Sequence, residues 1–279
     1  MILADLHTHT VFSHDAVRGG SVYDNCDSAI AQGFGYIAFT EHYDVDMIKT
    51  SKTRTFDLDG YRTAVAQAKE KYKGRLEVLY GMELGDAIKE TDEAKRLVEA
   101  ERFDFVIGSI HAPRKEYDFM SMSYDKTDDE MVKIFEEYLE DQIKQIKWAV
   151  EVKDRRFDTV AHITYPYRYY KLHGRDYLFD LNKDYLVEFS EIMKLCIENE
   201  IALECNTSGL RQNLGSLLPN ETLLRRYKEL GGELLTVGSD AHTPSDVGKD
   251  IKTTYEFLKT LGFRYTTVYK NRRAQQIKL

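Results

Sequence analysis

Proline, cysteine and long apolar runs are all scarce in this chain of 279 residues, and each shortage excludes a class of protein. With 4 prolines and no Ser/Gly-rich tract, the sequence offers no candidate for a flexible linker between domains. The 3 cysteines, Cys26, Cys196 and Cys205, are odd in number and form no C-x-x-C pair. We therefore expect buried free thiols in a reducing compartment rather than a disulfide framework.

The sequence also lacks the segments that direct a protein to or through a membrane. No apolar stretch reaches the roughly 18 residues that a membrane-spanning helix needs. The N-terminus shows no basic and apolar regions of a secretory signal, so the cytoplasm is the expected location. A net charge of −8 argues against broad binding to nucleic acid, although metal cations could reverse the charge locally and attract a small anionic substrate.

What the chain does contain is an alternation of short apolar runs with amphipathic segments. Strands are predicted at residues 2–6, 36–40, 76–81, 103–110, 157–161, 201–205 and 234–239. Helices are predicted at residues 21–33, 59–73, 92–101, 128–152, 183–199, 220–230 and 245–261. Strands that alternate with helices predict a parallel α/β sheet, and their number favours a distorted (β/α)7 TIM-like barrel. We expect one domain over residues 1–279.

All but one of the predicted strands end in side chains that bind metals. These side chains are His7, His9, His42, Glu83, His111, His162, Asp240 and His242. Because the carboxyl ends of parallel barrel strands meet at one face, we expect them to form a single cluster. The sixth strand ends differently, at Asn206-Thr207-Ser208.

The local spacing of these side chains fits metal binding. Residues i and i+2 of a strand face the same side, so His7 and His9 can hold one ion together, as can Asp240 and His242. Imidazole nitrogens mixed with carboxylate oxygens suit Zn, Mn or Fe. The set is large enough for two or three divalent transition-metal ions, with Glu83 able to bridge two of them. Ions a few Å apart favour hydrolysis of a phosphate ester.

These motifs, with Gly108-Ser109-Ile110-His111 and the stretch Asn206 to Arg211, resemble the PHP (polymerase and histidinol phosphatase) superfamily. The resemblance covers nearly the whole chain and is strongest to the histidinol-phosphate phosphatase branch. It implies one ion held by His7, His9, Glu83 and Asp240, a second by Glu83, His111 and His162, and a third by His42, His242 and a residue soon after His9. For that last ligand we assign Asp15, with the neighbouring His14 as the alternative.

The resemblance also implies an activity, which is hydrolysis of L-histidinol phosphate to L-histidinol and phosphate in histidine biosynthesis. A hydroxide bridging the metals would attack, with Glu83, Asp240 and His242 as catalytic residues. Family members place phosphate-binding arginines in two regions where this chain has Arg168 and Arg211. Guanidinium groups match phosphate geometry well.

Long loops at residues 112–128 and 165–178 are expected to shape substrate access. In the first, Arg114 is a weaker third candidate for phosphate binding, and Glu116, Tyr117, Asp118 and Phe119 are candidates for contact with the histidinol part.

Two other functions stay open from the sequence alone. The same site could hydrolyse another phosphomonoester, such as a nucleotide or a phosphotyrosine. Alternatively the domain could be a regulatory module without activity, which the nearly complete ligand set disfavours. Away from the site, we expect His173 at the surface and the basic segment from Lys270 to Lys278 as a solvated helical or frayed end.

Overall fold

A parallel β-sheet forms the centre of the computed structural model, which describes residues 1–16, 19–45, 56–115, 118–152, 154–212 and 214–279. Its strands are β1 (Leu3–Thr8), β2 (Phe34–Phe39), β3 (His42–Asp44), β4 (Glu77–Gly85), β5 (Phe105–Ser109), β6 (Thr159–Val160), β7 (Ala202–Asn206) and β8 (Leu235–Gly238). They pair in the order β1-β2-β4-β5-β6-β7-β8, and β3 pairs with β4. Every one of these pairings is parallel.

The sheet curves into a barrel that is nearly closed between its first and last strands. The Asp240 amide donates to the His7 carbonyl at 2.7 Å, and the His9 amide donates to the Ala241 carbonyl at 2.8 Å. The predicted distorted (β/α)7 barrel is therefore confirmed.

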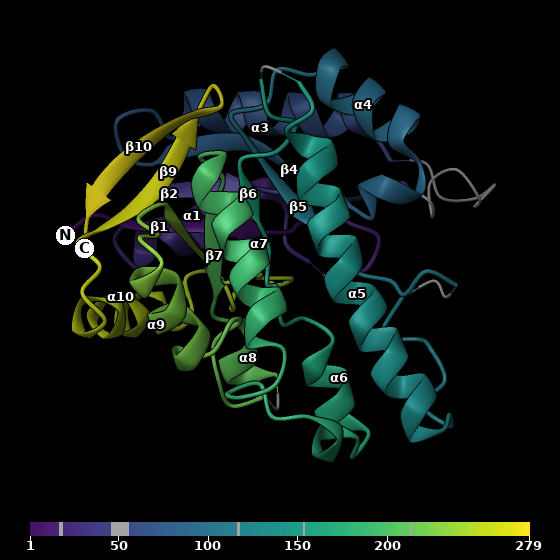
Figure 1. The fold of residues 1–279 in the computed structure, drawn as a ribbon. Coiled ribbons are helices and arrows are strands. Elements are labelled where there is room, and N and C mark those ends of the chain that lie inside the picture. Colours follow the sequence, from purple (N-terminus) through teal and green to yellow (C-terminus); the bar gives the residue numbers. More distant parts are fainter. Residues whose placement is uncertain (17–18, 46–55, 116–117, 153, 213) are drawn as a thin grey trace.

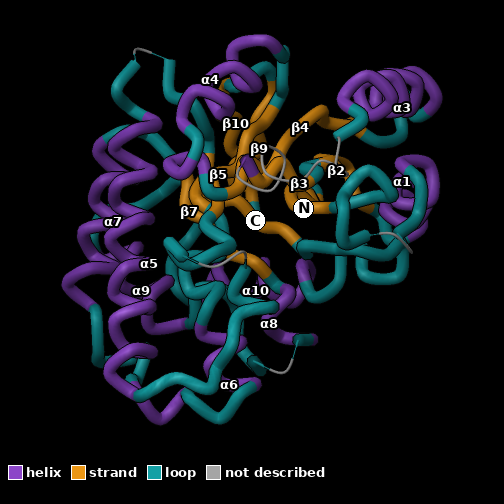
Figure 2. The backbone as a smooth tube through the Cα atoms, turned by 90° about the vertical axis from the view of Figure 1, so that its right-hand side faces the viewer, coloured by secondary structure: helices purple, strands orange, loops and turns teal. Residues whose placement is uncertain are grey.

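Helices follow most strands and lie outside the barrel, so that the strands are gathered in the middle of the molecule (Figure 1 and Figure 2). They are α1 (Val22–Ala31), α3 (Leu58–Lys71), α4 (Thr91–Ala100), α5 (Asp128–Ala149), α6 (Tyr167–Leu172), α7 (Leu186–Glu198), α8 (Ser208–Arg211), α9 (Glu221–Glu229) and α10 (Ile251–Thr260), with 3-10 turns η1 (Ala87–Lys89) and η2 (Asp176–Leu178). Capping boxes begin α1 at Ser21 and α5 at Thr127, where the hydroxyls satisfy otherwise unpaired amides.

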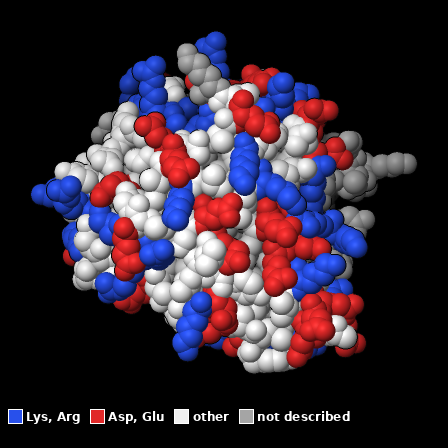
Figure 3. Space-filling model, viewed as in Figure 1, with Lys and Arg blue, Asp and Glu red and all other residues white. Residues whose placement is uncertain are grey.

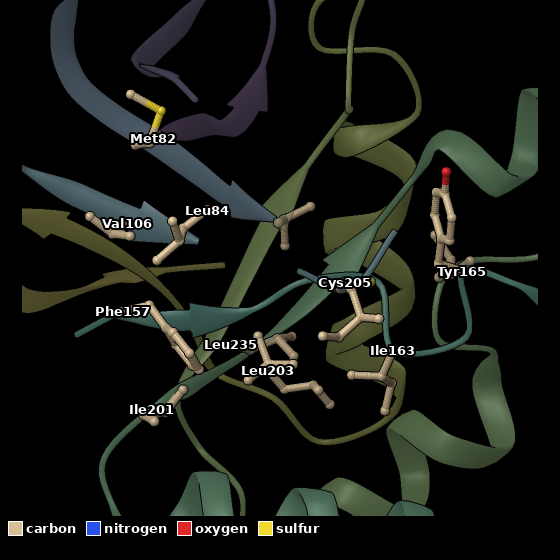
Figure 4. Close-up of a cluster of buried hydrophobic side chains, with 14 of the residues drawn as sticks. Met82, Leu84, Val106, Phe157, Ile163, Tyr165, Ile201, Leu203, Cys205 and Leu235 are labelled. Atoms are coloured by element: carbon tan, nitrogen blue, oxygen red, sulfur yellow. The ribbon is translucent and has the colours of Figure 1, made fainter. Parts of the chain in front are cut away.

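The main hydrophobic core fills the space between the sheet and these helices. Figure 4 shows part of it, where Met82 and Leu84 of β4, Val106 of β5 and Leu203 and Cys205 of β7 are buried together. All 3 cysteines are buried and unpaired, as expected from the sequence. Among the described helices, none combines the length and the apolar composition that crossing a membrane would take.

The C-terminal segment differs from the prediction. Instead of a helical or frayed end, it forms an antiparallel hairpin of β9 (Tyr265–Lys270) and β10 (Arg273–Lys278), with a tight turn at Asn271 and Arg272, both at positive φ. The alternation of Tyr, Thr and Val in β9 is a strand pattern that the basic residues obscured. Val268 and Tyr269 of β9 pack on the apolar side chains inside the barrel at its amino end.

Other differences are local. The short strand β3 was not predicted, because three residues give no periodicity. The segment 165–178, predicted as a loop, contains α6 and η2, and the helix predicted from residue 245 begins only at Ile251. His173 is exposed as predicted, with its ring stacked on Tyr124 at 4.1 Å between centroids.

Candidate metal centre

The carboxyl ends of the strands bring the predicted metal ligands together. We call the following set the ligand cluster: His7, His9, Asp15, His42, Glu83, His111, His162, Asp240 and His242. Each member lies within 4 Å of at least one other, measured between a ring nitrogen and a carboxylate oxygen. Residues from six separate strand ends therefore converge at one mouth of the barrel, as parallel topology predicts.

Glu83 lies at the centre of the ligand cluster and is fully buried. Its Oε2 is 3.1 Å from His7 Nε2 and 2.9 Å from His42 Nδ1. Its Oε1 is 3.1 Å from both His111 Nε2 and His162 Nε2. The two oxygens thus face two different groups of imidazoles, which is the arrangement required of a carboxylate that bridges two ions.

Asp240 supplies the second buried carboxylate. Its Oδ1 is 3.3 Å from His9 Nε2 and 3.8 Å from His7 Nε2. The backbone of Asp240 has a φ of 54°, in the left-handed region that residues other than glycine seldom adopt. Such strained conformations are found most often at functional sites, where surrounding contacts hold them.

The third group of side chains lies at the solvent side of the ligand cluster. Asp15 Oδ2 is 3.0 Å from His242 Nε2 and 3.4 Å from His42 Nε2, and the side chains of Asp15 and His242 are 34% and 29% exposed. His14, the alternative third ligand, has its Nδ1 3.9 Å from Asp44 Oδ2 instead. Asp15 therefore lies close to both His42 and His242, while the ring of His14 lies 5.4 Å from that of His42.

The donor set fits divalent transition-metal ions. His9 Nε2 and His42 Nδ1 are buried ring nitrogens that lie close to the carboxylates of Asp240 and Glu83 but, among the described residues, make no contact with hydrogen-bond geometry. Several sets of three donors converge closely enough to hold an ion, among them His7 with His9 and Asp240, and His42 with Glu83 and His111. Buried imidazoles facing carboxylates are the usual ligands of zinc and its neighbours.

The charges of the ligand cluster are strongly coupled. Burial would lower the pKa of His7, but the carboxylates of Glu204 and Glu83 raise it well above its usual value. Burial would raise the pKa of Glu83, but His7 and His111 hold it well below its usual value. By contrast, burial and the positive charge of His42 lower the pKa of His9 to about 3. The carboxylates are thus ionised and ready to accept cations.

Sequence reasoning missed the groups that hold the outer ring nitrogens. His7 Nδ1 is 2.6 Å from Glu204 Oε1, and His111 Nδ1 is 2.8 Å from Asp44 Oδ1. His9 Nδ1 is 3.1 Å from the hydroxyl of Ser13, which donates to Glu41. A buried acid within a strand, as Glu204 is in β7, was the available signal.

Of the two predicted phosphate-binding arginines, Arg211 contacts Asp240, and Arg168 contacts the residue that follows Arg211. Arg211 Nη2 donates to the Asp240 carbonyl at 2.8 Å, while its buried Nη1 has no partner among the described residues. Arg168 stacks on the ring of Tyr165, with 4.2 Å from Cζ to the ring centroid, and donates to Gln212 next to Arg211.

Arg114 lies elsewhere. Its guanidinium donates to Asp141 and Glu140 of α5 at 2.7 Å, so the structure does not support its candidacy for phosphate binding. Of the loop candidates, residues 116 and 117 lie outside the described residues. Phe119 is buried in the main core, and Asp118 is half-buried with one oxygen 3.5 Å from the Tyr165 hydroxyl.

Comparison with known proteins finds relatives that match nearly the whole chain. A probable histidinol-phosphatase of Clostridium acetobutylicum is 27% identical over 262 residues, covering 93% of this chain and 94% of the relative. The histidinol-phosphatase of Bacillus subtilis is 27% identical over 271 residues, covering 88% of this chain and 95% of the relative.

Solved structures show the same fold. The crystal structure of histidinol phosphate phosphatase from Lactococcus lactis, complexed with zinc, L-histidinol and phosphate, has a TM-score of 0.76 and 23% identity, covering 98% of each chain. A putative histidinol phosphatase from Listeria monocytogenes has a TM-score of 0.75 and 21% identity, covering 90% of this chain and 99% of that one. Residues 5–208 match the PHP domain family, which is most of the chain. The chain therefore belongs to the PHP domain family.

Proposed function

We propose that this enzyme is a metal-dependent phosphatase that hydrolyses L-histidinol phosphate to L-histidinol and inorganic phosphate. Relatives aligned over nearly the full length bear that activity in their names, and the Lactococcus lactis structure holds zinc with both products. The observation that carries the proposal for this chain is Glu83, whose two oxygens face two groups of imidazoles.

We propose two or three Zn, Mn or Fe ions at this centre. His7, His9, Glu83 and Asp240 would hold the first, Glu83, His111 and His162 the second, and Asp15, His42 and His242 the third. When bound, such ions supply a nucleophile at neutral pH and neutralise charge on the phosphoryl oxygens. The exposure of Asp15 and His242 makes the third position the one in closest contact with solvent.

The protein's own residues position the substrate and move the proton. The second oxygen of Asp240, Oδ2, points away from His9 toward Asn206 Nδ2, at 3.5 Å, and is placed to accept a proton from the attacking water. The unpartnered Nη1 of Arg211 and the stacked guanidinium of Arg168 would bind two phosphoryl oxygens. Together these contacts would hold the phosphate next to the ligand cluster.

The rim of the site suits a leaving group that carries an ammonium and an aromatic ring. Burial raises the pKa of Asp118, and the positive charge of His111 opposes that rise. The ring of Tyr165 lies nearby, with its centroid 5.2 Å from that of His111. We propose that Asp118 pairs with the substrate ammonium and Tyr165 packs on its imidazole. A nucleotide offers no ammonium group in the same position. Phosphotyrosine within a peptide chain offers none either, although the free amino acid does.

A comparison of substrates tests the proposed function. With zinc or manganese supplied, kcat/KM for phosphate release should be about 30- to 150-fold higher for histidinol phosphate than for nucleoside monophosphates, because one charge-assisted hydrogen bond contributes roughly 2–3 kcal/mol. Equal values would place the activity in the broader group of phosphomonoesterases. No release from histidinol phosphate or p-nitrophenyl phosphate with any metal would overturn the proposal.

Replacement of Arg211 by alanine should raise KM about 10- to 100-fold with a smaller change in kcat. The reason is the loss of a charge-assisted hydrogen bond to phosphate, worth about 1.5–3 kcal/mol. Steady-state kinetics with histidinol phosphate measure KM and kcat for the variant and the wild-type protein. Arg114→Ala is the matched control, since that guanidinium is bound to α5, and its KM should not change. An Arg211→Ala variant with unchanged KM would remove Arg211 from the phosphate site.

The rest of the molecule is consistent with a small substrate. On the face shown in Figure 3, acidic and basic side chains are interspersed, which gives nucleic acid no continuous basic path there. We also propose that residues 1–279 form one domain, because the β9–β10 hairpin lies beyond the matched residues 5–208 yet packs against barrel residues such as Phe105.

A further inference from the structure

The sixth barrel strand, β7, contributes no residue to the ligand cluster, yet it carries a buried carboxylate beneath it. Glu204 is only 1% exposed. Its Oε1 is 2.6 Å from His7 Nδ1, and its Oε2 accepts from the His162 amide at 2.8 Å and from Asn206 Nδ2 at 3.2 Å. Each oxygen therefore already has a partner within the protein, although Glu204 also lies close enough to His7 and His162 to form a set of three donors with them.

The contact with His7 selects one form of the imidazole. When Nδ1 carries the proton and donates it to Glu204, Nε2 is left with its lone pair, directed at Glu83 and Asp240. The close approach depends on Gly238 of β8, because a Cβ there would lie 2.3 Å from His7 Cβ and 3.0 Å from Glu204 Oε1. The contact thus holds the ring in an orientation that directs Nε2 at Glu83 and Asp240.

Glu204 also connects the two inner ion positions. Glu204 accepts a hydrogen bond from the amide of His162, which follows β6. The imidazole of the same residue faces Glu83 Oε1. Through Asn206, Glu204 reaches Asp240, since Asn206 Nδ2 is 3.5 Å from Asp240 Oδ2. Asn206 is itself fixed by the Ser208 amide, which donates to its Oδ1 at 2.8 Å. One carboxylate therefore contacts groups that belong to both positions.

We propose that Glu204 is a positioning residue of the metal centre, which orients His7 and couples the two inner ion positions without binding an ion itself. The inference rests on the proposed metal-dependent function. Partners of this kind, a carboxylate behind a metal-binding imidazole, change metal affinity by roughly 10- to 100-fold when removed.

The test measures zinc affinity in three variants of Glu204, by competition with a chromophoric chelator, and zinc content by elemental analysis. Glu204→Ala removes the contacts, and Glu204→Asp keeps the charge but shortens the reach. Glu204→Gln keeps the reach and leaves one of the two oxygens in place to accept hydrogen bonds. We expect zinc affinity to fall about 10- to 100-fold in the Ala and Asp variants and by less than about tenfold in the Gln variant.

A matched control separates positioning from stability. Asp158 is another fully buried carboxylate, bound to Arg272 Nε at 2.5 Å at the amino end of β6, on the far side of the barrel from the ligand cluster. Asp158→Asn should lower the melting temperature and leave zinc affinity unchanged.

The possible outcomes are distinct. Unchanged zinc affinity in Glu204→Ala would overturn the inference. An Asp variant that binds zinc better than the Gln variant would also overturn it, because charge rather than reach would then matter, as for a direct ligand. Wild-type protein that binds no zinc and releases no phosphate would instead contradict the proposed function itself.

Discussion

Replacement of Glu83 by glutamine should lower kcat for phosphate release by about 1,000-fold and reduce the bound metal. The neutral amide keeps the volume of the side chain but cannot offer two anionic oxygens to the imidazole groups on either side. A loss of about 4 kcal/mol of transition-state stabilisation corresponds to that change in rate. Steady-state kinetics with saturating zinc, together with elemental analysis, measure both effects.

The control for this variant lies on the same strand. Glu77 is six positions earlier in β4, at the opposite end of the barrel, where its carboxylate pairs with Lys270 and its side chain is 41% exposed. Glu77→Gln should keep its metal and its kcat. If Glu83→Gln retained more than a tenth of wild-type kcat, Glu83 would not be the bridging ligand.

Removal of metal by a chelator should abolish activity and lower the melting temperature, and both should return when zinc or manganese is added. An ion that binds only the folded state stabilises it by about 4 kcal/mol when its concentration is 1,000 times Kd. Differential scanning calorimetry before and after dialysis measures the shift. A protein that keeps full activity after exhaustive chelation would contradict any catalytic role for metal.

The loss of stability on metal removal should grow with pH between 7 and 9. In the metal-free protein, burial opposes protonation of His42 and His111. Nearby carboxylates outweigh this effect and raise both pKa values well above 6.5. The carboxylates are Asp15 and Glu83 for His42, and Glu83 and Asp44 for His111. A raised pKa in the folded state contributes stability that is fully present below 6.5 and is lost as pH rises through the folded value.

Bound ions replace those protons. The free energy of unfolding of the metal-loaded protein should therefore not fall in the same way between pH 7 and 9. His9 and His162, whose pKa values are lowered mainly by burial, are neutral in both states above pH 7 and contribute nothing there. A difference in melting temperature that stayed constant from pH 7 to 9 would contradict the charge coupling.

The sequence was most informative where chemistry and periodicity coincide. The alternation of strands and helices predicted the barrel, and metal-binding side chains at the strand ends predicted the convergence of His7, Glu83 and His111, because the carboxyl ends of parallel strands meet at one face. Glu204 was missed because a single acid inside an apolar strand has the same appearance whether it faces an imidazole or a backbone amide. Asp15 and His14 are adjacent, and only the path of the turn decided which of them faces His242.

The β9–β10 hairpin has a consequence for how substrate enters the site and how products leave it. Tyr269 stacks on Phe105, with 5.3 Å between ring centroids, and with Val268 it seals the amino end of the barrel with apolar side chains. Among the described residues, these side chains cover the end of the barrel opposite the ligand cluster. We therefore expect substrate and products to enter and leave at the end where the ligand cluster lies.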